Sequence, residues 1–165
     1  MAFTPLRDQI DPEPPRDMPC NVAAEQALLG ALLCDNREFS RIAKIVRAED
    51  FAWGVHQRIF AAIGKLTDAG MPANPVTLRH LFDNDPALRK AYPGGVYLVR
   101  LARSAITLLN GADYAVIIAD LALRRKLIRE LYELRPAQTS LDILTDLRPQ
   151  LQTLAKAVRD LRAPQ

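Results

Sequence analysis

The stretch Ala23–Asn36, which reads AAEQALLGALLCDN, decides the fold of this chain. Its central part, from Ala27 to Cys34, carries no polar side chain. A helix that is apolar on all sides belongs inside a protein rather than on its surface. The run is far shorter than the roughly 20 apolar residues that span a bilayer, and alanine, leucine and glycine are poor strand formers. The stretch therefore predicts a central core helix, around which the later helices pack.

Three residues of this helix carry separate expectations. Gly30 costs about 1 kcal/mol relative to alanine inside a helix, so its presence predicts a close approach by another helix backbone. Glu25 lies near the helix start, where a negative charge is favoured, and is expected to face solvent or to pair with an arginine. A catalytic carboxylate is the alternative for Glu25. Cys34 is expected to be a reduced core residue.

The composition of the 165 residues is that of an ordinary globular protein. The apolar fraction is 49% and the formal net charge is +3, which does not by itself indicate nucleic-acid binding. The positive charge is concentrated late in the chain, since residues 124–165 hold nine basic and five acidic side chains. The sequence contains no signal peptide, transmembrane span or lipidation motif, so a cytoplasmic location is expected and a membrane partner is not.

Hydrophobic residues at spacings of three and four predict a series of further short helices. Asp35 and Asn36 are expected to supply a turn and the cap of an amphipathic surface helix that carries Phe39 to Arg47, and the next helix is expected to end at Gly70. Asn74 and Pro75 form a start signal for a fourth helix, and a fifth is expected over residues 96–103. No strand pattern occurs, so the fold class is all-α. The expected core residues of these helices are Phe39, Ile42, Ile45, Val46, Val55, Ile59, Phe60, Ile63, Leu66, Leu78, Leu81, Phe82, Tyr97, Leu98 and Leu101.

Two long apolar patterns follow residue 110 and predict an antiparallel helical hairpin. The first arm is expected over residues 112–134. The second arm carries a ladder of leucines at coiled-coil spacing, in which Pro149 is expected to introduce a kink. A short connection forces two such helices to lie antiparallel. We therefore divide the chain into a tail (1–19), a compact head of about five to six helices (20–110), a projecting hairpin (111–162) and a short end (163–165).

The hairpin has more apolar surface than two helices can bury between them, so self-association as a dimer or higher ring is expected. The alternative is that the ladder only seals one arm against the other. The residues expected to mediate self-association or partner binding are Ile117, Leu121, Ile128, Leu131, Leu144, Leu147, Leu151, Leu154, Val158 and Leu161. A basic cluster is either a solvated helix face or a contact for acidic protein or phosphate. It consists of Arg124, Arg125, Lys126 and Arg129.

The sequence contains no catalytic motif that we can identify. It has neither GxxxxGK[ST] nor GxGxxG, so no phosphate-binding loop is present. His56 and His80 are isolated and lack a partner at metal-ligand spacing, and His56 is expected to be structural. Cys20 and Cys34 are likewise not in a metal or redox spacing. No catalytic residue, metal or cofactor is expected.

Several motifs, in order, resemble the N-terminal domain of the bacterial replicative DNA helicase, the DnaB family. The resemblance begins at Pro19 and extends to about Leu161, with asparagine at Asn74 where the family usually has aspartate. The matching segments are AAEQA at 23–27, GALLCDN at 30–36, Asp50-Phe51 with His56, IFAAI at 59–63, Gly70 with Pro72, VTL at 76–78, GGVYL at 94–98, and Asn110, Tyr114 and Arg125.

This resemblance implies a helical head with a hairpin that dimerises, within a collar that binds primase and, in some systems, helicase loaders. The family's ATPase domain has no counterpart after Leu161, so ATP hydrolysis and DNA unwinding are not expected. The chain is then a helicase fragment or a stand-alone homologue. The expected function is a non-catalytic replisome interaction module that binds itself and primase, replicative helicase or a loader. The alternatives are a small basic helical DNA-binding regulator, although nucleic-acid contact is expected to be weak or indirect, and a helicase-mimicking inhibitor of replication.

Overall fold

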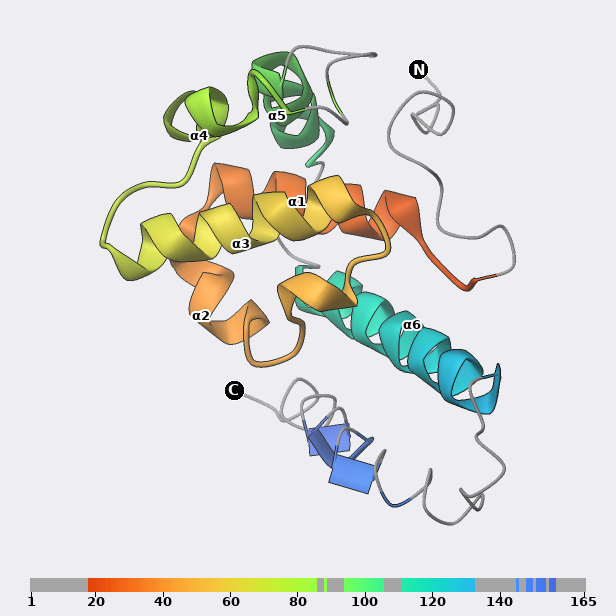
Figure 1. Ribbon diagram of the computed structural model, residues 1–165. Coiled ribbons are helices and arrows are strands. Elements are labelled where there is room, and N and C mark those ends of the chain that lie inside the picture. The colour runs from red at the N-terminus through yellow and green to blue at the C-terminus, as the bar shows by residue number, and fades with distance from the viewer. Residues whose placement is uncertain are drawn as a thin grey trace.

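The fold is all-helical and is built around one central helix (Figure 1). The computed structural model describes residues 18–85, 88, 94–105, 111–132, 145, 148–149, 151–153 and 155–156, and no strand occurs within them. The α-helices are α1 (Val22–Cys34), α2 (Phe39–Ile42), α3 (Gly54–Asp68), α4 (Pro75–Phe82), α5 (Gly94–Ser104) and α6 (Gly111–Tyr132). Two short 3-10 helices, η1 (Asn36–Glu38) and η2 (Ala48–Asp50), flank α2.

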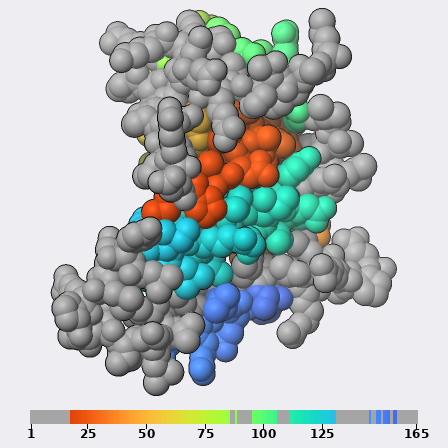
Figure 2. All heavy atoms as spheres, turned by 90° about the vertical axis from the view of Figure 1, so that its right-hand side faces the viewer, coloured from red at the N-terminus to blue at the C-terminus, as the bar shows by residue number. Residues whose placement is uncertain are grey.

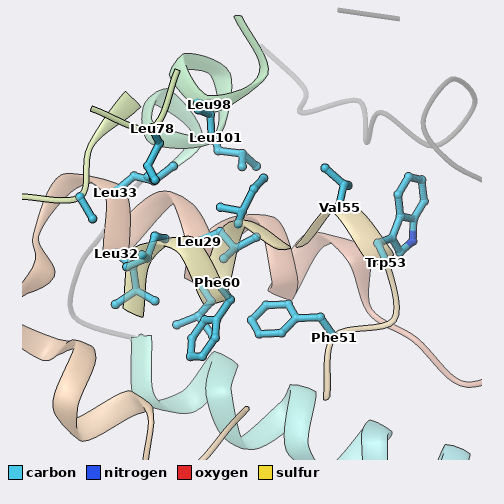
Figure 3. Close-up of a cluster of buried hydrophobic side chains, with 14 of the residues drawn as sticks. Leu29, Leu32, Leu33, Phe51, Trp53, Val55, Phe60, Leu78, Leu98 and Leu101 are labelled. Carbon is cyan, nitrogen blue, oxygen red and sulfur yellow. The ribbon is translucent and has the colours of Figure 1, made fainter. Parts of the chain in front are cut away.

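The expected central position of α1 is confirmed. This helix packs against α3, α5 and α6, and Leu28 and Leu29 are fully buried. Its side chains meet those of α3 and α5 in the core, where Figure 3 shows Leu32 of α1 and Phe60 of α3 in one cluster. The helix begins at a cap, because the side chain of Asn21 accepts a hydrogen bond from the Ala24 amide at 3.0 Å.

Gly30 lies where α1 and α5 approach most closely. A Cβ atom at Gly30 would be only 2.2 Å from the Leu101 carbonyl oxygen and 3.3 Å from the Ala105 side chain. No side chain fits in that space without a shift of the α5 backbone. The expectation of a close helix approach at Gly30 is therefore confirmed.

The expected helix that carries Phe39 to Arg47 is wrong in extent, because α2 ends at Ile42. The chain instead forms η1 and the four-residue α2. Asn36 anchors the start of η1, because its side-chain amide donates to the Leu32 carbonyl at 2.6 Å and exchanges hydrogen bonds of 2.8 Å with the Ala73 backbone. A contact with a residue 37 positions away is not visible in local periodicity. The apolar residues of this segment nevertheless reach the core, and Ile42 and Val46 are buried.

The end of α3 and the start of α4 follow their sequence signals. Gly70 has a φ of 69°, which favours glycine. The Met71 and Gly70 amides donate to the Leu66 and Thr67 carbonyls at 2.8 and 3.0 Å, which is the Schellman arrangement. Asn74 caps α4 by accepting from the Val76 and Thr77 amides at 2.9 and 3.0 Å.

Two residues expected in the core lie at the surface. Leu81 is 52% exposed, because α4 covers the core with the side that carries Leu78 and Phe82. Cys34, the last residue of α1, is a free, exposed cysteine, although Leu32 and Leu33 just before it are buried. Its thiol donates to the Ala102 carbonyl of α5 at 3.4 Å.

Helix α6 lies against α1 and confirms the long helix that the sequence predicts (Figure 2). The described residues of the expected second arm, within 145–156, are helical and exposed. No helix in the described part of the chain is long and apolar enough to cross a membrane. Five expected hairpin residues, and the side chain of Leu131, lie outside the described residues. Those five are Leu144, Leu147, Leu154, Val158 and Leu161.

Candidate functional site on helix α6

Helix α6 presents two different apolar faces. Ala115 and Ile118 are buried against the head. Ile117, Leu121 and Ile128 are spaced by four and seven residues, which places them together on another side of the helix. Ile117 is 39% exposed, and the other two are half-buried. We call these three residues the α6 strip, and it includes three of the residues expected to mediate self-association.

The basic cluster is divided between the surface and the interior. Arg124 is exposed and forms an ion pair with Asp120, one turn earlier, at 2.8 Å. Arg129 is exposed and donates from Nε to the Arg125 carbonyl at 3.4 Å. Lys126 is half-buried. Of the four cations, three therefore reach the surface of α6, which leaves their contact with acidic protein or phosphate a prediction.

Arg125 corrects the expectation of an external contact. Its guanidinium is buried, at 7% exposure, and donates to the Pro19 carbonyl at 2.9 Å and to the Asp50 carbonyl. Burial lowers the pKa of Arg125, and the Glu25 carboxylate opposes this effect. The side chain fastens α6 to the segments before α1 and α3. The guanidinium is therefore not accessible to an external phosphate. Nothing in the sequence indicated this, because Arg125 is there one of several neighbouring cations.

A buried polar network lies beneath α5. The Glu25 carboxylate lies 2.6 Å from Nδ1 of His56 and accepts from the Ala52 amide at 2.7 Å. Nε2 of His56 lies 2.7 Å from the Tyr97 hydroxyl, to which the Gln26 amide donates at 3.4 Å. All four side chains are almost wholly buried. The network joins α1, α3 and α5 below the protein surface.

Glu25 was therefore wrongly expected to face solvent, and although it acts electrostatically on Arg125, its hydrogen bonds go to other partners. The turn before α3 and the start of α5 cover the first turn of α1, so the carboxylate is enclosed and bonds to a histidine and a backbone amide. The structural role expected of His56 is confirmed, since its ring bonds on both sides and stacks on Trp53. Sequence reasoning missed Tyr97 as the second partner of His56, and Gln26 as the partner of Tyr97. Their separation of 71 residues leaves no local signal.

Within the ranges described, no group of three or more histidine, cysteine or acidic side chains is arranged to hold a metal ion. The buried network includes only two such side chains, Glu25 and His56, and neither reaches solvent. An external substrate therefore has no direct access to them. At the surface, the described helices present apolar and charged side chains.

A head of helices around one apolar helix, continued by a long helix with an exposed apolar strip, defines the class of fold. The family model described as "DnaB-like helicase N terminal domain" matches residues 17–120. This chain belongs to that family. The match covers the head and the first part of α6.

Curated relatives and a solved structure agree with this assignment. The chain is 40% identical over 121 residues to the replicative DNA helicase DnaB of Rickettsia felis, covering 73% of this chain and 24% of that protein. It is 33% identical over 128 residues to the DnaB of Mycobacterium leprae, covering 78% of this chain and 20% of that protein. The chain thus spans about a quarter of the length of these relatives or less.

The structural likeness extends over most of the chain. The crystal structure of the N-terminal domain of DnaB helicase from Mycobacterium tuberculosis superposes with a TM-score of 0.61 and 27% sequence identity. The likeness covers 82% of this chain and 98% of that one. The expected fold and the expected family are therefore both confirmed.

Proposed function

We propose that this chain is a non-catalytic replisome interaction module, which self-associates through residues 111–162 and binds primase, a replicative helicase or a helicase loader. The α6 strip is the observation that carries the proposal. Helix α6 already contributes Ala115, Ile118 and Arg125 to the head, so the strip is apolar surface beyond what the head requires. Family membership supports a role in DNA replication.

Pairing of two hairpins explains this surplus of apolar surface. Twofold pairing is the commonest closed arrangement of identical chains, and it buries the same patch of both copies. Leu151, in the expected second arm, is 45% exposed and so adds to the surface that pairing would bury. The other expected contacts of that arm are part of the same proposal.

A non-catalytic role follows from what the chain shares with its relatives. Relatives named replicative DNA helicases match over only about a quarter of their length or less, within a family described as an N-terminal domain. The sequence has no GxxxxGK[ST] loop to hold the phosphates of ATP. The proposal therefore assigns binding, rather than ATP hydrolysis, to these residues.

Light scattering of two matched variants tests self-association. Leu151→Asp places a charge in the proposed contact, and burying an unpaired charge there is strongly unfavourable. Gln152→Asp places the same charge on the next residue, which is exposed and already polar. We expect the native chain and Gln152→Asp to share one assembled mass, and Leu151→Asp to have a lower one. Equal masses for the two variants would contradict pairing through this arm.

Binding measurements separate the proposal from a DNA-binding regulator. We expect the chain to bind purified bacterial primase, and to bind duplex DNA only weakly at physiological ionic strength. A regulator that neutralises phosphates would instead bind duplex DNA with an affinity that falls steeply with salt. The ion pair of Arg124 and the burial of Arg125 reduce the charge available for such contacts. Steep salt-dependent binding without primase binding would favour the regulator.

A further inference from the structure

The buried polar network holds a hydroxyl that can donate in two directions. Burial raises the pKa of the Tyr97 phenol well above its usual value, so Tyr97 keeps its proton. The hydroxyl has two neighbours: Nε2 of His56 at 2.7 Å, and the Gln26 amide, whose nitrogen donates to the hydroxyl oxygen at 3.4 Å and whose oxygen could accept if the amide turned. Because a hydroxyl has a single proton, it donates to only one of them at a time.

The protonation of His56 decides which neighbour receives the proton. With a neutral ring, Nδ1–H donates to Glu25, and Nε2 accepts from the Tyr97 hydroxyl. The Gln26 amide nitrogen then donates to the Tyr97 oxygen. With a doubly protonated ring, both ring nitrogens donate. The Tyr97 oxygen now accepts from Nε2–H, and its own proton must go to Gln26.

Gln26 can follow this change because its amide is held on one side only. Its Oε1 atom is buried and has no hydrogen-bond partner among the described residues. Turning the amide by half a rotation exchanges oxygen and nitrogen and brings an acceptor to the Tyr97 hydroxyl. Either orientation makes one hydrogen bond to Tyr97, so the His56 proton selects between them.

We propose that Glu25, His56, Tyr97 and Gln26 form a proton-linked switch in the head, in which protonation of His56 reverses the Tyr97 hydroxyl and turns the Gln26 amide. The switch changes the direction of the polar connection between α5 and the α1–α3 pair. It is independent of the proposed self-association, since none of its residues lies in 111–162.

Charged groups from each packed helix act on this switch. The Glu25 carboxylate of α1 lies against Nδ1 of the ring. Arg125 of α6 interacts electrostatically with Glu25, so Arg125 and the His56 ring compete for the negative charge of that carboxylate. Asp50 of η2 interacts electrostatically with Arg125. Arg100 of α5 acts on Tyr97. The Ala52 amide also donates to the carboxylate and stabilises its ionised form.

Nuclear magnetic resonance of the full chain during an acid titration tests the switch. We expect the neutral His56 ring to carry its proton on Nδ1 and to gain a second one on Nε2 as pH falls. The Gln26 side-chain amide signals should move with the same midpoint. His80, which is exposed on α4, is the internal control and should titrate without moving Gln26. The switch is excluded if His56 stays neutral until the chain unfolds, or if it titrates while the Gln26 signals stay in place.

Two variants test the coupling itself. Tyr97→Phe removes the hydroxyl, so His56 titration should no longer move the Gln26 amide, whereas Tyr114→Phe on α6 should leave the coupling intact. If Tyr97→Phe does not fold, Gln26→Met removes the acceptor that the charged state needs. His56 protonation should then require a lower pH than in the native chain. An unchanged midpoint in Gln26→Met, or retained coupling in Tyr97→Phe, would overturn the proposal.

Discussion

At the scale of single residues, Gly30 sets the distance between two helices. Gly30→Ala adds a Cβ atom 2.2 Å from the Leu101 carbonyl oxygen. We expect an overpacking cost of about 1–3 kcal/mol, which exceeds the gain in helix propensity of about 1 kcal/mol. Urea unfolding followed by circular dichroism measures the net loss.

Gly95→Ala is the matched control for this prediction. The three atoms nearest to a Cβ atom at Gly95 all belong to the Arg79 side chain, the first at 3.0 Å, and that side chain is exposed and can move. The same substitution should therefore be neutral or slightly stabilising at Gly95. Equal losses at both positions would show that backbone contact with α5 is not the cause.

Asp35 gives a pH-dependent prediction. Hydrogen bonds from the Arg37 side chain, and then from its backbone amide, lower the pKa of Asp35 from 3.8 to about 2. Because the pKa of Asp35 is lower in the folded state, the ionised carboxylate stabilises the fold. This stabilisation is complete above pH 3.8 and is lost as the pH falls through about 2. Asp35→Asn has no carboxylate to protonate and should lack this acid-induced loss of stability. Between pH 3.8 and about 2, the native chain should therefore lose stability relative to the variant.

Urea unfolding of both chains at several pH values measures the difference. Asp68→Asn, which changes an exposed aspartate at the end of α3, serves as the control. A stability difference between native chain and Asp35→Asn that is constant with pH would rule out this role of the Arg37 contact.

At the scale of the elements, the start of α4 depends on one side chain. Asn74→Ala removes the acceptor for the Val76 and Thr77 amides, at an expected cost of about 1 kcal/mol. Asn74→Asp keeps an acceptor in the same place and should retain the native stability. If the two variants unfold alike, the cap does not stabilise this helix.

Local signals predicted some elements and failed for others. The end of α3 at Gly70 and the start of α4 at Asn74 were predictable, because a Schellman turn and a cap use only neighbouring residues. The anchoring of η1 was not, because Asn36 bonds to the backbone of Ala73, far along the chain. Leu81 was wrongly placed in the core for a related reason. The spacing of apolar residues shows which side of a helix is apolar, but not how much of that side other helices will bury.

At the scale of the whole molecule, Arg125 joins α6 to the head. Arg125→Met should leave the half-buried carbonyl groups of Pro19 and Asp50 without this donor. Hydrogen bonds that involve a charged group contribute about 1.5–3 kcal/mol, so a loss of about that size is expected in thermal or urea unfolding.

Arg124→Met is the matched control, since it removes only an exposed ion pair with Asp120. Such pairs contribute about 0–1 kcal/mol. A loss at position 124 as large as at position 125 would contradict the assignment of Arg125 as the residue that fastens the two parts.

The amino-acid sequence by itself determined the central helix, its glycine contact, the all-helical class and the family. These follow from residue type and short spacing: an apolar run must be buried, and caps and turns bond within a few residues. Only the tertiary structure decided where the charges of Glu25 and Arg125 lie. Both look like surface charges locally, yet Glu25 bonds to His56 and Ala52, and Arg125 to two distant carbonyls. Burial of a charge depends on partners supplied by other helices, and no local pattern records which helices will meet.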